Sequence, residues 1–194
     1  MADLPLILAS SSPFRQELLQ RLHLPFEAIS PDIDETRHLQ EPAQQYVSRL
    51  AEEKARKISQ HHPDHVVIGS DQCALLDGEI LGKPGNHENA MKQLQKARGK
   101  EVVFYTGLSV QLATRNLCLV DCIEFRVGFR QLSDAQLEHY LLEEQPYNCA
   151  GSFKSEAYGI TLFSHMQGDD PTALVGLPLI RLTAMLEQAG VQVV

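Results

Sequence analysis

The chain has 194 residues, a formal net charge of −8 at neutral pH and a hydrophobic fraction of 43%, which is typical of a globular protein that buries a substantial core. The acidic excess argues against a dedicated nucleic-acid binder or a ligand of anionic membranes. It does not exclude a small polyphosphate ligand, which needs only a few local cations and a metal ion. No apolar run reaches membrane-spanning length, and Met1–Pro5 lacks the basic start of a signal peptide. We therefore expect a single cytoplasmic domain over residues 1–194.

The N-terminal segment predicts a strand that leads directly into a helix. The apolar run Leu6–Ala9 ends in three serines and Pro13, and leucines then recur at helical spacing. Ser11 or Ser12 can cap the helix, and Pro13 suits its first turn, where no N–H is needed. Serine hydroxyls, free backbone N–H groups and Arg15 then converge at the N-terminus of the helix. Such a place binds phosphate or another anion.

The rest of the chain alternates between helical and extended patterns. Helices are expected over about 42–59, 86–97, 133–141 and 178–189, and strands over about 65–71, 102–112, 117–129 and 160–163. Asp77–Gly78 predicts a tight hairpin turn, and Ser133–Gln136 predicts a capping box. This interleaving predicts an α/β fold in which helices flank a mixed, twisted sheet.

Two charged residues lie where packing alone does not require them. Lys54 lies four residues after Leu50 and four before Ile58, on or beside the apolar stripe of its helix. It either snorkels past the edge of the core or points at a phosphate. Asp71 ends the buried run 65–71, so we expect it at the carboxyl end of a strand. It is either a turn-former or helix cap, or a group that holds a metal or deprotonates water.

Two loops carry further candidate ligands. Asp32, Asp34 and Glu35 form either a solvated loop or a set of carboxylates that holds Mg²⁺ against substrate phosphates. Lys83, between Gly82 and Pro84, fits a phosphate cradle as well as an exposed turn. The sequence contains no P-loop, dinucleotide-binding, nucleophile-elbow or zincin motif, so those classes of enzyme have no support.

Taken in order, these segments resemble the Maf family of nucleotide pyrophosphatases. The matching segments are Leu8–Arg15, Asp34–Thr36, Ala51–Ala55, Gly69–Gln72, Gly82–Pro84, Tyr105–Gly107, Ala150–Glu156 and Val175–Pro178. The resemblance implies an elongated, two-lobed fold with a central cleft, akin to the inosine-triphosphate pyrophosphatases. It also implies hydrolysis of a nucleoside triphosphate between its α and β phosphates, with Mg²⁺, Mn²⁺ or Co²⁺ as cofactor. A homodimer is compatible with the family.

The resemblance implies roles for individual residues at this site. Asp71 is implied as the proton acceptor, with Glu35 as the alternative base, and Lys54 and Lys83 are implied as further catalytic residues. The metal is assigned to Glu35 and Asp71 without deciding which of them holds it. Cations offset the triphosphate charge and favour a transition state whose charge moves to the leaving pyrophosphate. The residues implied to line the phosphate and metal site, besides Asp71, are Ser10, Arg15, Glu35, Lys54 and Lys83.

Phe14, Gln72 and Glu156 together resemble the branch of the family that acts on 7-methyl-GTP. N7-methylated guanine carries a delocalised positive charge, which an aromatic face at Phe14 attracts. Glu156 can accept hydrogen bonds from the guanine N1–H and N2 amine, and Gln72 can donate and accept at another edge of the base. Where this chain has Phe14 and Gln16, that branch usually has tryptophan and a second basic residue.

The expected function is therefore the removal of 7-methyl-GTP before it enters nucleic acid, a house-cleaning activity that a role in cell-division arrest can accompany. Two alternatives stay open. One is the dTTP and UTP pyrophosphatase activity of the sister branch, and the other is a nucleotide-binding regulator of septum formation without turnover. The partner expected is a small-molecule nucleotide, with no nucleic acid and no membrane.

Overall fold

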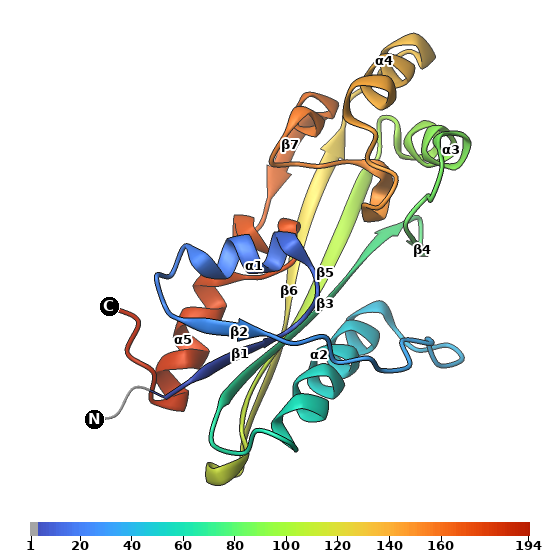
Figure 1. The fold of residues 1–194 in the computed structure, drawn as a ribbon. Helices are drawn as coiled ribbons and strands as arrows, with labels where there is room; N and C mark the ends of the chain where they lie inside the picture. Colours follow the sequence, from blue (N-terminus) through green and yellow to red (C-terminus); the bar gives the residue numbers. More distant parts are fainter. Residues whose placement is uncertain (1–3) are drawn as a thin grey trace. The chain divides into compact units, whose positions relative to one another are not determined.

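The computed structural model describes residues 4–194, which form a seven-stranded sheet and five α-helices (Figure 1). The strands are β1 (Leu6–Ala9), β2 (Phe26–Ala28), β3 (Val66–Leu76), β4 (Glu79–Leu81), β5 (Glu101–Leu112), β6 (Leu117–Phe129) and β7 (Phe163–Gln167). The helices are α1 (Pro13–Gln20), α2 (Ala43–Ser59), α3 (His87–Ala97), α4 (Asp134–Glu144) and α5 (Leu179–Ala189). Short 3₁₀ helices include η2 (Ala150–Ser152), η3 (Tyr158–Leu162) and η4 (Pro171–Val175).

The sheet is mixed. Its strand order is β2-β1-β3-β5-β6-β7, and β4 pairs with β3. β1 pairs in parallel with β2 and β3, whereas β4 and β7 pair antiparallel with β3 and β6. The predicted α/β fold with a mixed sheet is therefore confirmed.

No helix in the described part of the chain is both long and apolar enough to span a bilayer. Met1–Asp3, part of the segment that argued against a signal peptide, lie outside the described residues.

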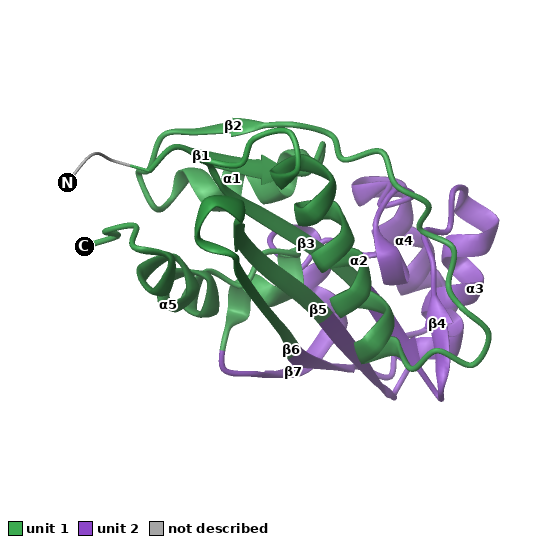
Figure 2. Ribbon diagram, turned by 90° about the horizontal axis from the view of Figure 1, so that it is seen from below, with its two compact units in different colours: residues 1–72, 106–123, 170–194 green, residues 73–105, 124–169 purple. Residues whose placement is uncertain are grey.

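The chain divides into two compact units (Figure 2). Unit 1 contains Met1–Gln72, Thr106–Ile123 and Asp170–Val194, and unit 2 contains Cys73–Tyr105 and Glu124–Asp169. Each of the long strands β3, β5 and β6 contributes one part to each unit. The two units match the two-lobed organisation that the resemblance implies, and the single domain over 1–194 stays a prediction.

Unit 1 buries both faces of its part of the sheet because its strands alternate apolar side chains on the two sides. Leu6 and Leu8 of β1 belong to the cluster that includes Leu18 of α1 and Leu182 of α5. The intervening side chains, Ile7 and Ala9, pack with Ala55 and Ile58 of α2. Figure 1 accordingly shows α2 on one side of these strands and α1 and α5 on the other.

Two glycines allow α2 to lie very close to the sheet in unit 1. A Cβ atom on Gly69 of β3 would lie 2.1 Å from the carbonyl oxygen of Ala51, and one on Gly107 of β5 would lie 2.1 Å from that of Val47. Real Cβ atoms do not approach backbone so closely, so any side chain here would push the helix away. This close packing brings Lys54, within the next turn of α2, to Asp71, two residues beyond Gly69.

Unit 2 has an aromatic core. Phe153 makes edge-to-face contacts with Phe104, Phe129 and Phe163, with ring centroids 4.8–5.7 Å apart. Such geometry aligns the positive edge of one ring with the negative face of the next. The predicted capping box at the start of α4 is present, and the predicted hairpin turn at 77–78 joins β3 to β4.

Two expectations about the elements were wrong, and one strand was not predicted. The third strand does not end at Asp71 but continues to Leu76, because it goes on to pair with β4 after β1 has ended at Ala9. Residues 160–162 belong to η3, and the strand there is β7, Phe163–Gln167. Strand β2 was not predicted at all, since three residues are too few to show a period.

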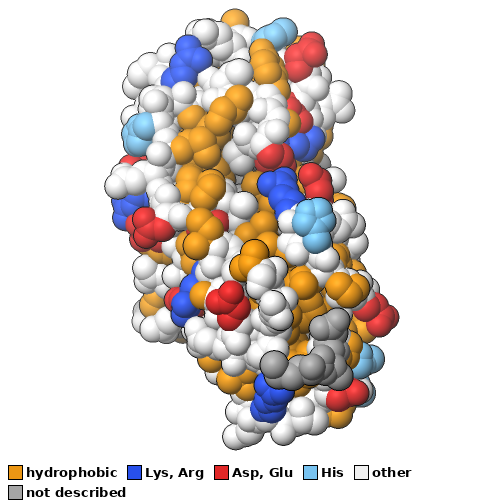
Figure 3. All heavy atoms as spheres, turned by 90° about the vertical axis from the view of Figure 1, so that its left-hand side faces the viewer, with side chains coloured by type: hydrophobic (Ala, Val, Ile, Leu, Met, Phe, Trp, Pro, Cys, Tyr) orange, Lys and Arg blue, Asp and Glu red, His pale blue; other side chains and the backbone are white. Residues whose placement is uncertain are grey.

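Figure 3 shows one face of the molecule, on which the described Lys and Arg side chains are interspersed with Asp, Glu and hydrophobic side chains. On this face the cations do not gather into a continuous stripe. The expectation that the protein binds no nucleic acid stays a prediction.

The four cysteines of the described residues form no disulfide bond. Cys73 is buried on β3, whereas Cys118 is exposed on β6. The strand pattern from 117 to 122 leaves alternate positions open to solvent.

Candidate active site

The turn between β1 and α1 has the geometry that its serines predict. Ser12 is the N-cap of α1, and its Oγ accepts a hydrogen bond from the Arg15 backbone N–H at 3.4 Å. Ser10 is buried, and its Oγ accepts one from the Ser12 N–H at 3.1 Å. Pro13 occupies the first helical turn. Because the first N–H groups of a helix have no partner within it, this turn offers donors to an anion.

Arg15 links α1 to the loop that follows η4. Its Nε donates to the carbonyl oxygen of Gly176 at 2.8 Å. Burial lowers the pKa of Arg15, and the nearby carboxylates of Asp71 and Glu35 act in the opposite direction. A guanidinium stays protonated in either case, so Arg15 supplies a fixed positive charge beside two acidic groups.

Lys54 is the centre of this site in unit 1. Its Nζ lies 2.6 Å from Asp71 Oδ1 and 2.7 Å from Glu35 Oε1, and its side chain is only 7% exposed. The alternative that Lys54 snorkels to solvent is therefore wrong. Asp71 is buried within β3, so it is neither a turn-former nor a helix cap. Two acidic groups thus share one buried ammonium, with Arg15 close to both.

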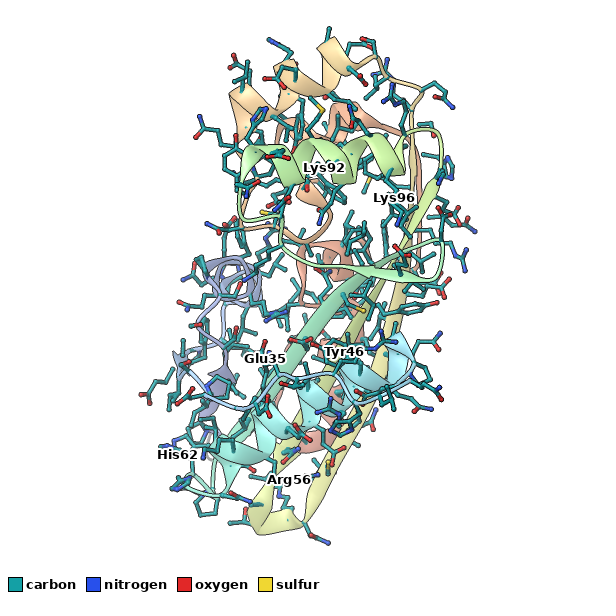
Figure 4. The ribbon with its side chains drawn as sticks, turned by 90° about the vertical axis from the view of Figure 1, so that its right-hand side faces the viewer. Glu35, Tyr46, Arg56, His62, Lys92 and Lys96 are labelled. Carbon is teal, nitrogen blue, oxygen red and sulfur yellow. The ribbon has the colours of Figure 1, made fainter. Side chains whose placement is uncertain are left out.

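The loop that carries Glu35 is fastened to the first half of α2. Tyr46 Oη donates to the backbone carbonyl of Glu35 at 2.9 Å, and Figure 4 shows the two residues close together. Arg49 makes a bidentate ion pair with Glu41, at 2.7 and 2.8 Å, and also donates to the carbonyl oxygen of Thr36 at 3.2 Å. Asp34 accepts from the Thr36 N–H and lies in the same loop. The Glu35 side chain, 58% exposed, keeps one face toward solvent.

The Glu41–Arg49 pair predicts a pH-dependent stability. Hydrogen bonds from Arg49 lower the pKa of Glu41 from 4.5 to about 2. Because the pKa is lower in the folded state, the pair stabilises the fold fully above pH 4.5, and its contribution is lost as the pH falls from 4.5 to about 2. Arg49→Met is therefore expected to lower the free energy of unfolding by about 1–2 kcal/mol at pH 7 and by much less at pH 2.

Urea unfolding of both proteins at pH 7, 4.5, 3 and 2 measures this difference. Arg56→Met is the control, because Arg56 is half-exposed on the same helix and forms an i, i+4 ion pair with Glu52. It is expected to cost less than about 0.5 kcal/mol. A deficit in Arg49→Met that stayed constant across this pH range would contradict the role given to the pair.

Gln72 does not present its amide group freely. Its Nε2 donates to the carbonyl oxygens of Ala173 and Leu174, at 2.7 and 3.1 Å, and lies 3.1 Å from Thr106 Oγ1. The amide N–H groups are thus used by η4 and β5 of the same unit. The side-chain oxygen of Gln72 is the group that it can still offer to a base.

The sequence assigned no individual role to three further polar residues of this region, although Ser70 and Thr106 lie in segments that carry the family resemblance. Ser70, fully buried, donates from Oγ to the carbonyl oxygens of Gly107 and Gly176, each at 2.9 Å. Thr106 Oγ1 donates to the carbonyl of Ala173 at 2.9 Å. Their partners lie 37 to 106 residues away, so no local pattern could reveal these contacts.

Asp170 is the third of these residues. Its Oδ1 accepts from the backbone and hydroxyl of Thr172, and its Oδ2 accepts from the Ile180 N–H at 2.8 Å at the start of α5. It is 3% exposed. One buried carboxylate therefore shapes η4 and caps α5, which fixes the loop that holds Arg15 and Gln72.

Lys83 and Glu156 lie in unit 2, and both side chains are exposed. Lys83 follows β4 in an extended loop, and Glu156 follows the turn at η2. Both charges act on the thiol of Cys149, although burial is the main cause that raises its pKa. The structure therefore brings Lys83 and Glu156 into one neighbourhood of unit 2, while the other predicted site residues belong to unit 1.

Glu35 and Asp71 are the acidic groups that fit a divalent cation. Both carboxylates contact the same ammonium, and hard oxygen donors are the ligands that Mg²⁺ and Mn²⁺ prefer. Residues 4–194 contain no group of three or more His, Cys, Asp or Glu that could hold a metal ion. A cation here therefore needs water or phosphate oxygens as its other ligands, which is the usual manner of Mg²⁺ binding.

The sequence of this chain matches a known protein family. Residues 5–189 match the family described as Maf-like protein. The chain belongs to the Maf family. The predicted family is thereby confirmed over almost the whole chain.

Maf relatives of high identity carry a common name. A protein from Nitrosococcus oceani named 7-methyl-GTP pyrophosphatase is 57% identical over 185 residues, covering 95% of this chain and 93% of the relative. One from Pseudomonas fluorescens with the same name is 53% identical over 190 residues, covering 98% and 99%. These relatives are named for the branch of the Maf family that the sequence resembles.

Solved structures confirm the fold at low sequence identity. The Ham1 protein of Staphylococcus aureus has a TM-score of 0.54 at 13% identity, and a HAM1 protein of Coxiella burnetii has 0.52 at 14%. Each match covers 95% of this chain and 99% of the other. The chain therefore shares its fold with these Ham1 proteins.

Proposed function

We propose that this Maf protein hydrolyses 7-methyl-GTP to 7-methyl-GMP and pyrophosphate. The observation that carries the proposal is the buried ammonium of Lys54 held between Asp71 and Glu35, with Arg15 beside them. Cations and carboxylates gathered beside a helix N-terminus suit a substrate that brings several negative charges and a divalent ion. The names of relatives 53–57% identical to this chain support the choice of nucleotide.

The proposed phosphate site combines fixed charge with oriented donors. Arg15, Lys54 and the Ser10–Ser12 turn neutralise and orient the triphosphate from unit 1. Lys83, exposed on unit 2, is proposed to bind phosphate as well. Pyrophosphate leaves with more charge than it carries in the substrate, so these cations stabilise the transition state more than the ground state.

Asp71 is the proposed general base. Its Oδ1 is engaged by Lys54, which leaves its second oxygen to accept a proton from water. Water oxygen forms a bond to the α-phosphorus, the bond from that phosphorus to the bridging oxygen breaks, and pyrophosphate departs. A divalent cation at Glu35 and Asp71, with Mg²⁺, Mn²⁺ and Co²⁺ as the candidates, would neutralise phosphate oxygens when bound.

The base is proposed to be recognised by shape and charge. Phe14 is 37% exposed at the start of α1, where its ring can stack on the cationic 7-methylguanine. Glu156 is proposed to accept hydrogen bonds from the guanine N1–H and N2 amine. Because the amide N–H groups of Gln72 already bind Ala173 and Leu174, its contribution to the base is through its side-chain oxygen.

Pyrophosphate release from 7-methyl-GTP, GTP, dTTP, UTP and ITP, with Mg²⁺ or Mn²⁺, tests the proposal. We expect the highest kcat/KM for 7-methyl-GTP. Preference for dTTP or UTP would retain the phosphate chemistry and refute the account of the base. Binding of nucleotide by folded protein with no turnover would favour the regulator of septum formation.

Two substitutions of one residue sharpen the test. Phe14→Leu is expected to lower the ratio of kcat/KM for 7-methyl-GTP to that for GTP by about three- to tenfold, because leucine has no π-face for the cation. Phe14→Trp is expected to raise the same ratio, since tryptophan is the better partner for a cation. Equal ratios in all three proteins would contradict stacking by Phe14.

A cytoplasmic location and a homodimer stay predictions.

A further inference from the structure

Gln93 of α3 uses both ends of its side-chain amide within unit 2. Its Nε2 donates to the carbonyl oxygen of Gly82 at 3.1 Å. Its Oε1 accepts from the hydroxyl of Ser152 at 2.6 Å. We propose that Gln93 is a positioning residue, which holds the Lys83 loop and the segment leading to Glu156 in one arrangement for substrate binding. The inference rests on the proposed function, which assigns phosphate to Lys83 and the base to Glu156.

The Lys83 loop is held on both sides of the lysine by one face of α3. Asn89 Nδ2 donates to the carbonyl oxygen of Pro84 at 3.1 Å, and Gln93 does the same for Gly82. Residues four apart lie on the same face of a helix. The side-chain amides of Asn89 and Gln93 therefore both hydrogen-bond to the backbone on either side of Lys83. The Gly85 N–H donates to the carbonyl of Tyr147 at 2.9 Å and completes the support. The backbone is thereby fixed while the Lys83 side chain extends into solvent.

Ser152 is an unusual residue at which to anchor a loop. It is fully buried and has a φ of +64°, directly after Gly151 with a φ of +76°. Left-handed backbone costs free energy in a residue other than glycine, and surrounding contacts must therefore maintain it. Its hydroxyl binds Gln93, and the next residue, Phe153, packs into the aromatic core. The segment that leads to Glu156 is thus held at its start by the Ser152 hydrogen bond and by the packing of Phe153.

An amide serves both contacts at this position because it carries a donor and an acceptor. A carboxylate at residue 93 could still accept from Ser152 but would repel the carbonyl of Gly82, and an aliphatic side chain could do neither. Lys83 and Glu156 also both act electrostatically on Cys149, so the two charges lie in one neighbourhood. We therefore expect the loss of both contacts of Gln93 to affect phosphate binding and recognition of the base together.

Hydrogen exchange of the full-length protein tests the positioning directly, without any assay of activity. Gln93→Leu is expected to raise backbone exchange by about tenfold in both 82–85 and 151–156, because each segment loses one hydrogen bond. The matched control is Gln95→Leu, since Gln95 is exposed two residues further along the same helix. It is expected to change neither segment. Unchanged exchange in both segments of Gln93→Leu would overturn the proposal.

Kinetics then separate the two contacts. Gln93→Glu is expected to raise KM for 7-methyl-GTP about tenfold while keeping the preference over GTP. Ser152→Ala, which spares the Gly82 contact, is expected to lower that preference instead. Gln93→Leu should show both effects, with kcat changed less than KM. Equal kcat and KM values for Gln93→Leu and the unsubstituted protein would overturn the proposal.

Double variants distinguish positioning from a general loss of stability. Lys83→Ala is expected to cost less in the Gln93→Leu background than alone, because the lysine is then no longer held in place. Additive effects would refute the coupling. If neither Lys83→Ala nor Glu156→Ala alters kinetics, the proposed function of these two residues fails, and the exchange measurement still decides the role of Gln93.

Discussion

Asp71→Asn is expected to lower kcat for 7-methyl-GTP by about 10²- to 10⁴-fold while leaving nucleotide affinity within a few-fold. Asparagine matches aspartate in size, and its oxygen can still accept the hydrogen bond from Lys54. It cannot take a proton from water. The expected loss is therefore one of proton transfer, and it falls on kcat rather than on binding.

Single-turnover pyrophosphate release gives the rate, and titration with a non-hydrolysable α,β-methylene analogue gives the affinity. Asp77→Asn is the matched control, because Asp77 is a half-exposed residue at the tip of the β3–β4 turn. It is expected to retain full activity. More than a tenth of normal activity in Asp71→Asn would assign the base elsewhere, and joint loss of binding and folding would make Asp71 a structural residue.

Lys54→Met is expected to produce the largest loss of stability, about 3–5 kcal/mol. The Asp71 side chain is only 12% exposed. Without the Lys54 ammonium, its Oδ1 loses its ion-pair partner, and burial prevents water from hydrating the carboxylate fully. Glu35 is 58% exposed and can turn to water, so it adds little to the loss. Urea unfolding at neutral pH measures the change.

Two comparisons identify the cause of that loss. The double variant Lys54→Met with Asp71→Asn is expected to recover most of the stability, because no buried charge is then left unpaired. Lys57→Met, exposed one turn later on α2, is expected to cost less than about 0.5 kcal/mol. If the double variant were as unstable as Lys54→Met alone, lost packing rather than lost charge pairing would explain the effect.

Local patterns in the sequence predicted the features that depend on neighbouring residues, namely where a helix begins and which of its faces is buried. The serine cap and Pro13 set the start of α1, and the apolar stripe of α2 put Lys54 on or beside the buried face of that helix without deciding whether it reaches solvent. Side-chain period and capping are properties of neighbouring residues, so they can be read without the fold. The ordered segments from Leu8 to Pro178 also carried the resemblance to the Maf family.

Contacts between distant residues were decided by the tertiary structure alone. Asp71 was expected at the end of a strand, but β3 continues to Leu76 because β4 pairs with it. Arg15 binds the carbonyl of Gly176, 161 residues away, and Gln72 binds that of Ala173, 101 residues away. Sequence spacing carries no signal for such pairs. The sequence alone predicted that charged residues of unit 1 gather around Lys54. The packing of α2 and η4 against the strands decided which atoms they contact, because hydrogen-bond partners depend on distances in the folded chain.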